Sequence, residues 1–195
     1  MIDEAKKERL KKMGIRDSKL LTPERRRELS PKIKKMADGF SVSVVAVEEI
    51  DSHVNERGLN RLEIKKMQEI INQLNPDLAV VDSPERNTKA FRKKILSGLR
   101  TECDVIAENY ADKNHIEVGA ASIIAKVTRD SEIKKLHKQY GNFGSGYTSD
   151  PETVGFLKDW LKKNKQFPPF VRKSWITAQV MLTEKQQMKI DRCVK

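Results

Sequence analysis

The stretch LAVVDSP, residues 78–84, decides the fold class of this chain. Its four apolar residues, Leu78–Val81, form a short run bounded by turn residues. Such a run is typical of a strand that is buried on both faces of a sheet. The strand is expected to end at Asp82, and open α/β sheets place functional residues at the carboxyl ends of their strands. Asp82 is therefore the first candidate for chemistry.

Helices and strands alternate along the rest of the chain. Apolar spacing and capping signals predict helices over residues 3–13, 22–37, 59–74, 88–96, 116–138 and 150–164, and a helical tail after Pro168-Pro169. The alternating β-branched residues of Phe40–Val47 predict a second strand, and Asp104–Glu108 a third. Strands that alternate with helices indicate an α/β fold with helices flanking a sheet.

The composition indicates a soluble and basic protein. A length of 195 residues suits one domain with a C-terminal appendage. Lys and Arg number 39 against 28 Asp and Glu, and the net charge of +11 favours a polyanionic partner. The sequence shows no membrane span and no secretory signal, so a cytoplasmic location is expected. Cys103 and Cys193 lack CxxC spacing, which argues against a zinc site or a disulfide framework.

Asp112 is the second candidate acid, because it lies between the strand expected over 104–108 and the long helix. Two acids at neighbouring strand ends can converge, and their oxygens could hold a hard cation that meets a phosphate. Alternatively, each is a turn or helix-capping aspartate, and spacing alone favours this alternative. His115 could assist Asp112 or be structural, and His137, among lysines, is expected on the solvated surface.

Gly141–Tyr147 must form a loop, because its glycines disfavour both helix and strand. Glycines let backbone N–H groups approach a phosphate closely. Tyr147 adds a flat ring for stacking and a hydroxyl for a sugar oxygen. A tight turn with a packed tyrosine is an equally good interpretation.

Five stretches match one family in order. They are GIRDSK (14–19), AVVDSP (79–84), AASIIAKV (120–127) followed by Arg129-Asp130, GSGYTSDP (144–151) and PFVR (169–172) with Trp175. In these motifs the chain resembles the type 2 ribonucleases H, specifically archaeal ribonuclease HII, from about residue 8 to residue 178. The resemblance implies an RNase H-like mixed sheet flanked by helices. It also implies a catalytic domain over 1–162 and a C-terminal helical segment over 163–195.

The resemblance further implies an endonuclease that hydrolyses the RNA strand of RNA·DNA hybrids and cuts at ribonucleotides embedded in duplex DNA. Family enzymes bind two Mg²⁺ or Mn²⁺ ions through four carboxylates, which suits in-line displacement at phosphorus. Asp82 and Asp112 match the third and fourth of these carboxylates, so both are expected to be catalytic and to bind metal.

The same resemblance implies a set of substrate-binding residues. Tyr147 matches the family tyrosine that reads the ribose, with Ser145 and Gly146 beside it in the loop, and Lys19 matches a basic residue near the substrate. The expected partners are RNA·DNA hybrids and ribonucleotide-containing duplex DNA, bound by a monomer. The sequence gives no support for a sliding-clamp partner.

The chain departs from the family pattern at two places. Asn109-Tyr110 stands where the family has His-Lys before its fourth carboxylate, which removes basic character there. The first two family carboxylates lie in a Gly-Ile-Asp-Glu-Ala-Gly-Arg-Gly motif on a strand, roughly 20 residues further upstream of the Asp-Ser-Lys motif. Here Asp3-Glu4 continues into lysines without a glycine turn, so we interpret this pair as the acidic first turn of a small helix.

Three interpretations of the chain follow from these departures. In the first, the recorded start is an internal methionine and the native product, with its first strands, is active. In the second, the chain is a catalytically weak or inactive RNase H-like module that binds hybrids, because first strands and half of the carboxylates are missing. In the third, Asp3-Glu4 folds back to replace the missing pair.

Overall fold

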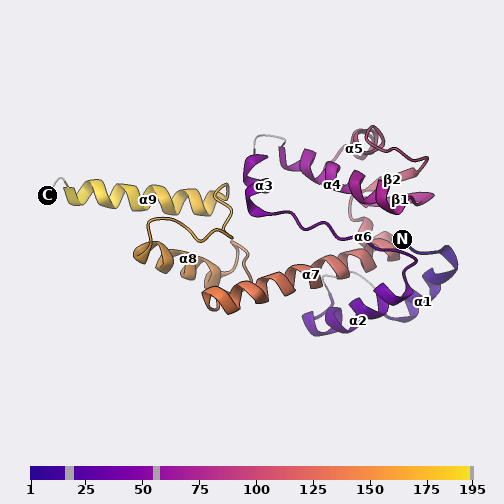
Figure 1. Cartoon of the computed structure of the whole chain (residues 1–195), viewed down its shortest axis with the longest axis horizontal. Helices are drawn as coiled ribbons and strands as arrows, with labels where there is room; N and C mark the ends of the chain where they lie inside the picture. Colours follow the sequence, from indigo (N-terminus) through magenta and orange to yellow (C-terminus); the bar gives the residue numbers. More distant parts are fainter. Residues whose placement is uncertain (16–19, 55–57, 194–195) are drawn as a thin grey trace. The chain divides into compact units, whose positions relative to one another are not determined.

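The computed structural model describes residues 1–15, 20–54 and 58–193 of the chain, with side chains as far as residue 187 (Figure 1). The chain divides into two compact units. The first consists of Met1–Val44 and Asn60–Ser131, and the second of Val45–Leu59 and Glu132–Lys195. The domain boundary expected after residue 162 stays a prediction.

Helices dominate both units (Figure 1). The elements are η1 (Glu4–Lys6), α1 (Lys7–Lys12), α2 (Pro23–Met36), α3 (Val47–Ser52), α4 (Gly58–Leu74), β1 (Leu78–Asp82), α5 (Thr88–Leu96), β2 (Asp104–Glu108), α6 (Ala111–Asn114), α7 (Ile116–Tyr140), α8 (Pro151–Lys163) and α9 (Ile176–Cys193). Local signals set several ends. Thr22 caps α2 by accepting a hydrogen bond from the N–H of Arg25 at 3.2 Å, and Asn75 ends α4 in the left-handed conformation with φ +47°.

Two parallel strands form the sheet of the described residues. Their register pairs Leu78 with Asp104 and Asp82 with Glu108, so both strands end at the same edge. The strand positions agree with the prediction, but burial on both faces does not. Ala79 is buried on one face of the sheet, whereas Leu78, which points to the opposite face, is 46% exposed, because α4 and α5 pack on the Ala79 face. Helices α4 and α5 share a core with the sheet, formed by Ile64, Ile71, Ala79, Phe91, Ile95, Cys103 and Val105.

The strand predicted over Phe40–Val47 is wrong. Residues 40–46 have no regular structure, and α3 begins at Val47. The alternation is present, but its apolar side chains face solvent, since Phe40 is 48% and Val44 67% exposed. A strand requires a neighbour that bonds its N–H and C=O groups, and no described strand pairs with this segment.

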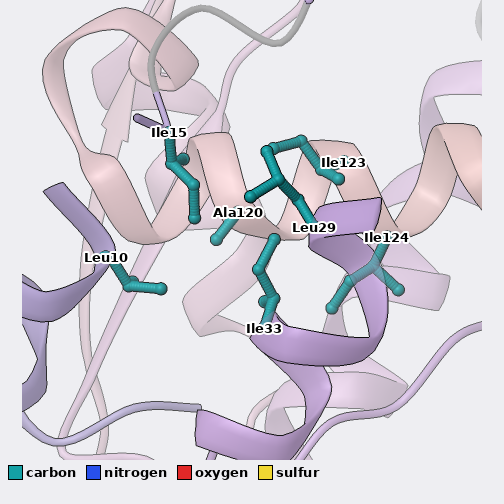
Figure 2. Packing of buried hydrophobic residues seen from close by; sticks show 7 residues of the cluster. All are labelled: Leu10, Ile15, Leu29, Ile33, Ala120, Ile123 and Ile124. Atoms are coloured by element: carbon teal, nitrogen blue, oxygen red, sulfur yellow. The ribbon is translucent and has the colours of Figure 1, made fainter. Parts of the chain in front are cut away.

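A second core of the first unit joins α2 to the first half of α7 (Figure 2). Leu29 and Ile33 of α2 pack with Ile123 and Ile124 of α7, and Leu10 of α1 closes the cluster. The AASIIAKV motif therefore supplies buried packing residues. This core fixes the helix that follows directly after α6 and Asp112.

The second unit has its own core, between α8, the turn after it and α9. Its buried members are Leu157, Leu161, Phe167, Val171, Ala178 and Met181. The carboxylate of Asp51 in α3 accepts hydrogen bonds from the N–H of Lys173 at 2.9 Å and the hydroxyl of Ser174 at 2.6 Å.

In the described part of the chain, no helix combines the length and the apolar character that a membrane crossing requires.

Candidate active site

The Asp82 carboxylate lies at the end of β1 and reaches the start of α6. Its Oδ1 accepts a hydrogen bond from the N–H of Ala111 at 3.2 Å, and Asp112 is the next residue. Asp82 is exposed, whereas Asp112 is only 6% exposed. The fold thus brings together the two acids that the sequence singled out, one facing solvent and one buried.

The turn between β2 and Asp112 is held by Asn109, which the sequence singled out only as the loss of a basic family residue. Asn109 Nδ2 donates to the carbonyl oxygens of Ser83 at 2.7 Å and Glu85 at 3.0 Å, which ties this turn to the segment after Asp82. The next residue, Tyr110, has φ +61°, an uncommon conformation for a large side chain. Asn109 therefore replaces a basic family residue with a bridge between the two strand ends.

An open pocket of about 650 Å³ lies beside Asp112. Its walls include Lys7, Lys11 and Lys113. The ammonium nitrogen of Lys113 lies 5.2 Å from the centre of the Tyr110 ring. Lys7 pairs with Glu4 at 2.7 Å and with Glu117, another wall residue, at 3.1 Å, and Lys11 pairs with Glu8 at 2.5 Å, so carboxylates neutralise part of this positive charge. The remaining positive charge suits a polyanion that approaches Asp112.

Two further ionisable side chains lie near the strand ends. Nε2 of His115 is 3.1 Å from Oε2 of Glu108, the residue that faces Asp82 in the strand register. Hydrogen bonds from Asn114 and then His115 lower the pKa of the Glu108 carboxyl. His115 thus contacts Glu108.

Metal binding here depends on few protein oxygens. Among the described residues, no three His, Cys, Asp or Glu side chains form a group that could hold an ion. Asp82 and Asp112 nevertheless supply hard oxygen donors at one edge, and Mg²⁺ is commonly held by one or two carboxylates together with water and substrate phosphate. The donor set fits a cation shared with a phosphate rather than an ion enclosed by protein.

Asp3 and Glu4 lie at the start of a short helix, as the sequence predicts. Oδ1 of Asp3 accepts a hydrogen bond from the N–H of Ala5 at 2.8 Å and so caps η1. Glu4 is highly exposed and pairs with Lys7 at 2.7 Å. Both acids have structural roles in this fold, which confirms the interpretation as an acidic first turn.

The Gly-Ser-Gly-Tyr segment is a loop, as predicted, and belongs to the second unit. Gly144 and Gly146 have φ +75° and +73°, the region in which glycine is favoured. Tyr147 is 53% exposed, so its ring is only partly packed.

The backbone N–H groups of this loop all donate within the protein. The acceptors are Oδ1 of Asn142 for Gly144, Oδ2 of Asp150 for Ser145, Oγ1 of Thr153 for Gly146 and Oγ of Ser145 for Tyr147. A phosphate would therefore have to displace these bonds. The exposed tyrosine side chain is the group that the loop presents.

Two more residues of this loop region depart from the sequence analysis. His137 is half-buried, with Nε2 2.8 Å from the Gly144 carbonyl oxygen and its ring against Phe143, so the expected solvated position is wrong. Asp150 accepts hydrogen bonds that the sequence analysis missed, although its place before Pro151 signals a helix cap. Lys19 lies outside the described residues.

The first unit thus combines a parallel sheet and flanking helices with acids at the strand ends and basic side chains near them, an arrangement that suits a metal-dependent nuclease of the α/β class. The family model of ribonuclease HII matches residues 1–178. The chain therefore belongs to the ribonuclease HII family, the type 2 ribonucleases H, which are endonucleases that depend on divalent metal ions.

Relatives agree with this assignment. Ribonuclease HII from Pyrococcus horikoshii is 43% identical over 100% of this chain and 90% of the relative, and that from Pyrococcus furiosus is 39% identical over 100% and 89%. The crystal structure of the ribonuclease H2 from Pyrococcus horikoshii OT3 has a TM-score of 0.87 at 43% identity, covering 94% of this chain and 87% of that chain. The PCNA:RNase HII complex from Archaeoglobus fulgidus has a TM-score of 0.82 at 38% identity, covering 90% and 83%. The predicted family and its RNase H-like α/β fold are confirmed.

Proposed function

We propose that this chain hydrolyses the RNA strand of RNA·DNA hybrids and cuts at ribonucleotides embedded in duplex DNA, by two-metal-ion catalysis with Mg²⁺ or Mn²⁺. The observation that carries the proposal is the hydrogen bond from Ala111 to Asp82, because it sets a strand-end carboxylate beside the buried Asp112. The net charge of +11 supports a nucleic-acid substrate.

Asp82 and Asp112 are the residues that would hold the ions. Bound divalent ions would neutralise phosphate charge and support an in-line displacement at phosphorus. The Ala111 N–H orients the Asp82 carboxylate, and burial limits the positions that the Asp112 side chain can adopt. Lys113, on the wall of the same pocket, would add positive charge for the scissile phosphate.

The substrate contact in the second unit is assigned to Tyr147. Its exposed ring would stack on a sugar or base, and its hydroxyl would bond a ribose oxygen. Ser145 and Gly146 would shape this contact through the loop backbone. Lys19 stays a proposed substrate-binding residue through the family resemblance. A sliding clamp is a candidate partner only through the likeness to the Archaeoglobus fulgidus complex.

A second candidate function is hybrid binding with weak or no cleavage. It is favoured by the lack of any group of three metal-ligating side chains among the described residues. Positive charge and an exposed tyrosine would suffice for binding, whereas hydrolysis needs firmly held ions.

Cleavage of a duplex with one embedded ribonucleotide, with Mn²⁺ supplied, separates the two candidates. The matched variants are Asp82→Asn and Asp77→Asn, which change exposed aspartates at opposite ends of the same strand region. We expect the unaltered chain to cut, Asp82→Asn to cut at least about 100-fold more slowly, and Asp77→Asn to cut normally. Binding without cleavage would favour the second candidate, and equal rates for all three would refute the assignment of Asp82.

A further inference from the structure

Asp150 lies between the Gly-Ser-Gly-Tyr loop and α8, and one of its carboxylate oxygens bonds the helix while the other bonds the loop. Oδ1 accepts a hydrogen bond from the N–H of Glu152 at 2.9 Å, which caps α8. Oδ2 accepts hydrogen bonds from both the N–H and the hydroxyl of Ser145, each at 2.6 Å. A helix cap requires the first oxygen only, so the second is available for another purpose.

The loop is built around this second oxygen. A Cβ atom at Gly144 would lie 2.5 Å from Oδ2 of Asp150, a distance that real Cβ contacts essentially never show. The carboxylate therefore occupies the space that a side chain at position 144 would need. The positive φ of Gly144 adds a second reason for glycine at this position.

Thr153 and His137 hold the loop from two further elements. Oγ1 of Thr153, a buried side chain, accepts from the N–H of Gly146 at 3.0 Å and donates to the carbonyl oxygen of Phe143 at 2.8 Å. His137 of α7 contacts the carbonyl oxygen of Gly144. The loop backbone is thus held along its length before Tyr147.

Tyr147 is the residue toward which these contacts lead. Its N–H donates to Oγ of Ser145 at 3.4 Å, and its carbonyl oxygen accepts from the N–H of Asp150 at 3.0 Å. The Ser145 hydroxyl therefore bonds both the Asp150 carboxylate and the Tyr147 N–H, so it links the position of the tyrosine backbone to that of Asp150. The ring itself remains 53% exposed. A rigid backbone with an exposed ring lowers the entropy lost when a ligand binds.

We propose that Asp150 is a positioning residue, which holds Ser145, Gly146 and Tyr147 in the conformation that contacts the ribose side of a ribonucleotide within a duplex. This inference rests on the proposed function, because the ligand is the proposed substrate. It adds a role that helix capping does not require, and it assigns that role to Oδ2 of Asp150.

The substitution Asp150→Ser separates capping from positioning. Serine is a good helix cap, but its short side chain cannot also bond Ser145. The matched control is Asn87→Ser, since Asn87 caps α5 by accepting from the N–H of Ala90 at 3.0 Å. The probes are a labelled duplex with one ribonucleotide and the same duplex in DNA only, with EDTA present to prevent cleavage, and the readout is fluorescence anisotropy.

We expect Asp150→Ser to weaken binding of the ribonucleotide duplex by about tenfold and to reduce its preference over the all-DNA duplex. Asn87→Ser should leave both unchanged, with similar melting temperatures for the two variants. An unchanged preference in Asp150→Ser, with a weakened preference in Tyr147→Ala, would overturn the role of Asp150 alone. Absence of binding by the unaltered chain would overturn the proposed function and this inference together.

A double variant tests whether Asp150 acts through Tyr147. If it does, Asp150→Ser added to Tyr147→Ala should weaken binding no further, because the two residues act as one unit. Additive losses would mean that Asp150 affects binding by another route, which would contradict the positioning role.

Discussion

The Asp82 carboxylate finds its hydrogen-bond donor 29 positions along the chain, whereas the Asp150 carboxylate finds Ser145 only 5 positions back. The first contact exists only when β1 and β2 pair in the correct register. The second requires one loop and the first turn of α8. The acid edge is therefore a product of tertiary folding, while the tyrosine loop is locally encoded. The two regions should fail under different changes.

The largest expected effect comes from removing the core beneath the acid edge. Phe91 of α5 is fully buried in the cluster that contains β1 and β2 residues, and Phe91→Ala should cost about 3–5 kcal/mol of unfolding free energy. Urea unfolding followed by far-UV circular dichroism measures this loss. Both tryptophans, Trp160 and Trp175, belong to the second unit. The urea midpoint measured by their fluorescence should therefore fall less than the midpoint measured by circular dichroism.

The matched change in the second unit is Phe143→Ala, directly before the Gly-Ser-Gly-Tyr loop. Phe143 is buried in the second unit, stacked on Phe170 at 4.9 Å between ring centres. In this variant the urea midpoint measured by tryptophan fluorescence should fall more than the midpoint measured by circular dichroism, which is the reverse of the result expected for Phe91→Ala. Equal shifts of both signals in both variants would show that the two units unfold together, and would remove the contrast between local and tertiary construction.

The same contrast explains which features the sequence could reveal. Local signals predicted α5, β2 and α8 closely, because caps, breakers and apolar spacing act within a few residues. Phe40–Val47 carries an equally strong local pattern but makes no strand, because a ladder needs a partner that no local pattern supplies.

Within the candidate site, residue types were predictable but their contacts were not. Asp82 and Asp112 could be predicted because they lie at or just after the ends of strands, and Tyr147 because it follows a glycine-rich stretch. The contacts of Asn109 and His137 carried no such signal, because Asn109 bonds Ser83, 26 positions away in the segment after β1, and the partner of His137 lies beyond the end of α7. The glycines indicate that the backbone N–H groups of the loop could approach a phosphate. The sequence does not show that Asp150 and Thr153 already accept hydrogen bonds from the N–H groups of Ser145 and Gly146.

A smaller effect is expected at the bridge between the strand ends. Asn109→Ala removes two hydrogen bonds to the Ser83 and Glu85 carbonyl oxygens. Since these bonds set the turn that leads to Asp112, we expect the cleavage rate to fall about tenfold, equivalent to roughly 1.4 kcal/mol. Single-turnover cleavage of the ribonucleotide duplex measures this change.

Asn72→Ala is the control for this bridge. Asn72 also bridges two chain segments, donating to the Gly98 carbonyl oxygen at 3.1 Å and accepting from the N–H of Arg100 at 2.8 Å. These contacts lie on the chain before β2, away from the carboxyl ends of the strands. We expect a similar loss of stability with a normal cleavage rate. If Asn72→Ala slowed cleavage as much as Asn109→Ala, general destabilisation would account for both.

The smallest expected effect is the titration of the loop. Hydrogen bonds from the Ser145 hydroxyl, the Ser145 N–H and the Glu152 N–H lower the pKa of Asp150 to about 2 from its ordinary 3.8. Because the folded-state pKa is depressed, the stabilisation from this carboxylate is fully present above pH 3.8 and is lost as the pH falls through about 2. Carboxyl ¹³C shifts should therefore place the Asp150 midpoint near 2. Asp150→Asn should lose this pH-dependent contribution, since an amide does not titrate there, and a midpoint close to 3.8 would mean that Oδ2 does not hold the loop in solution.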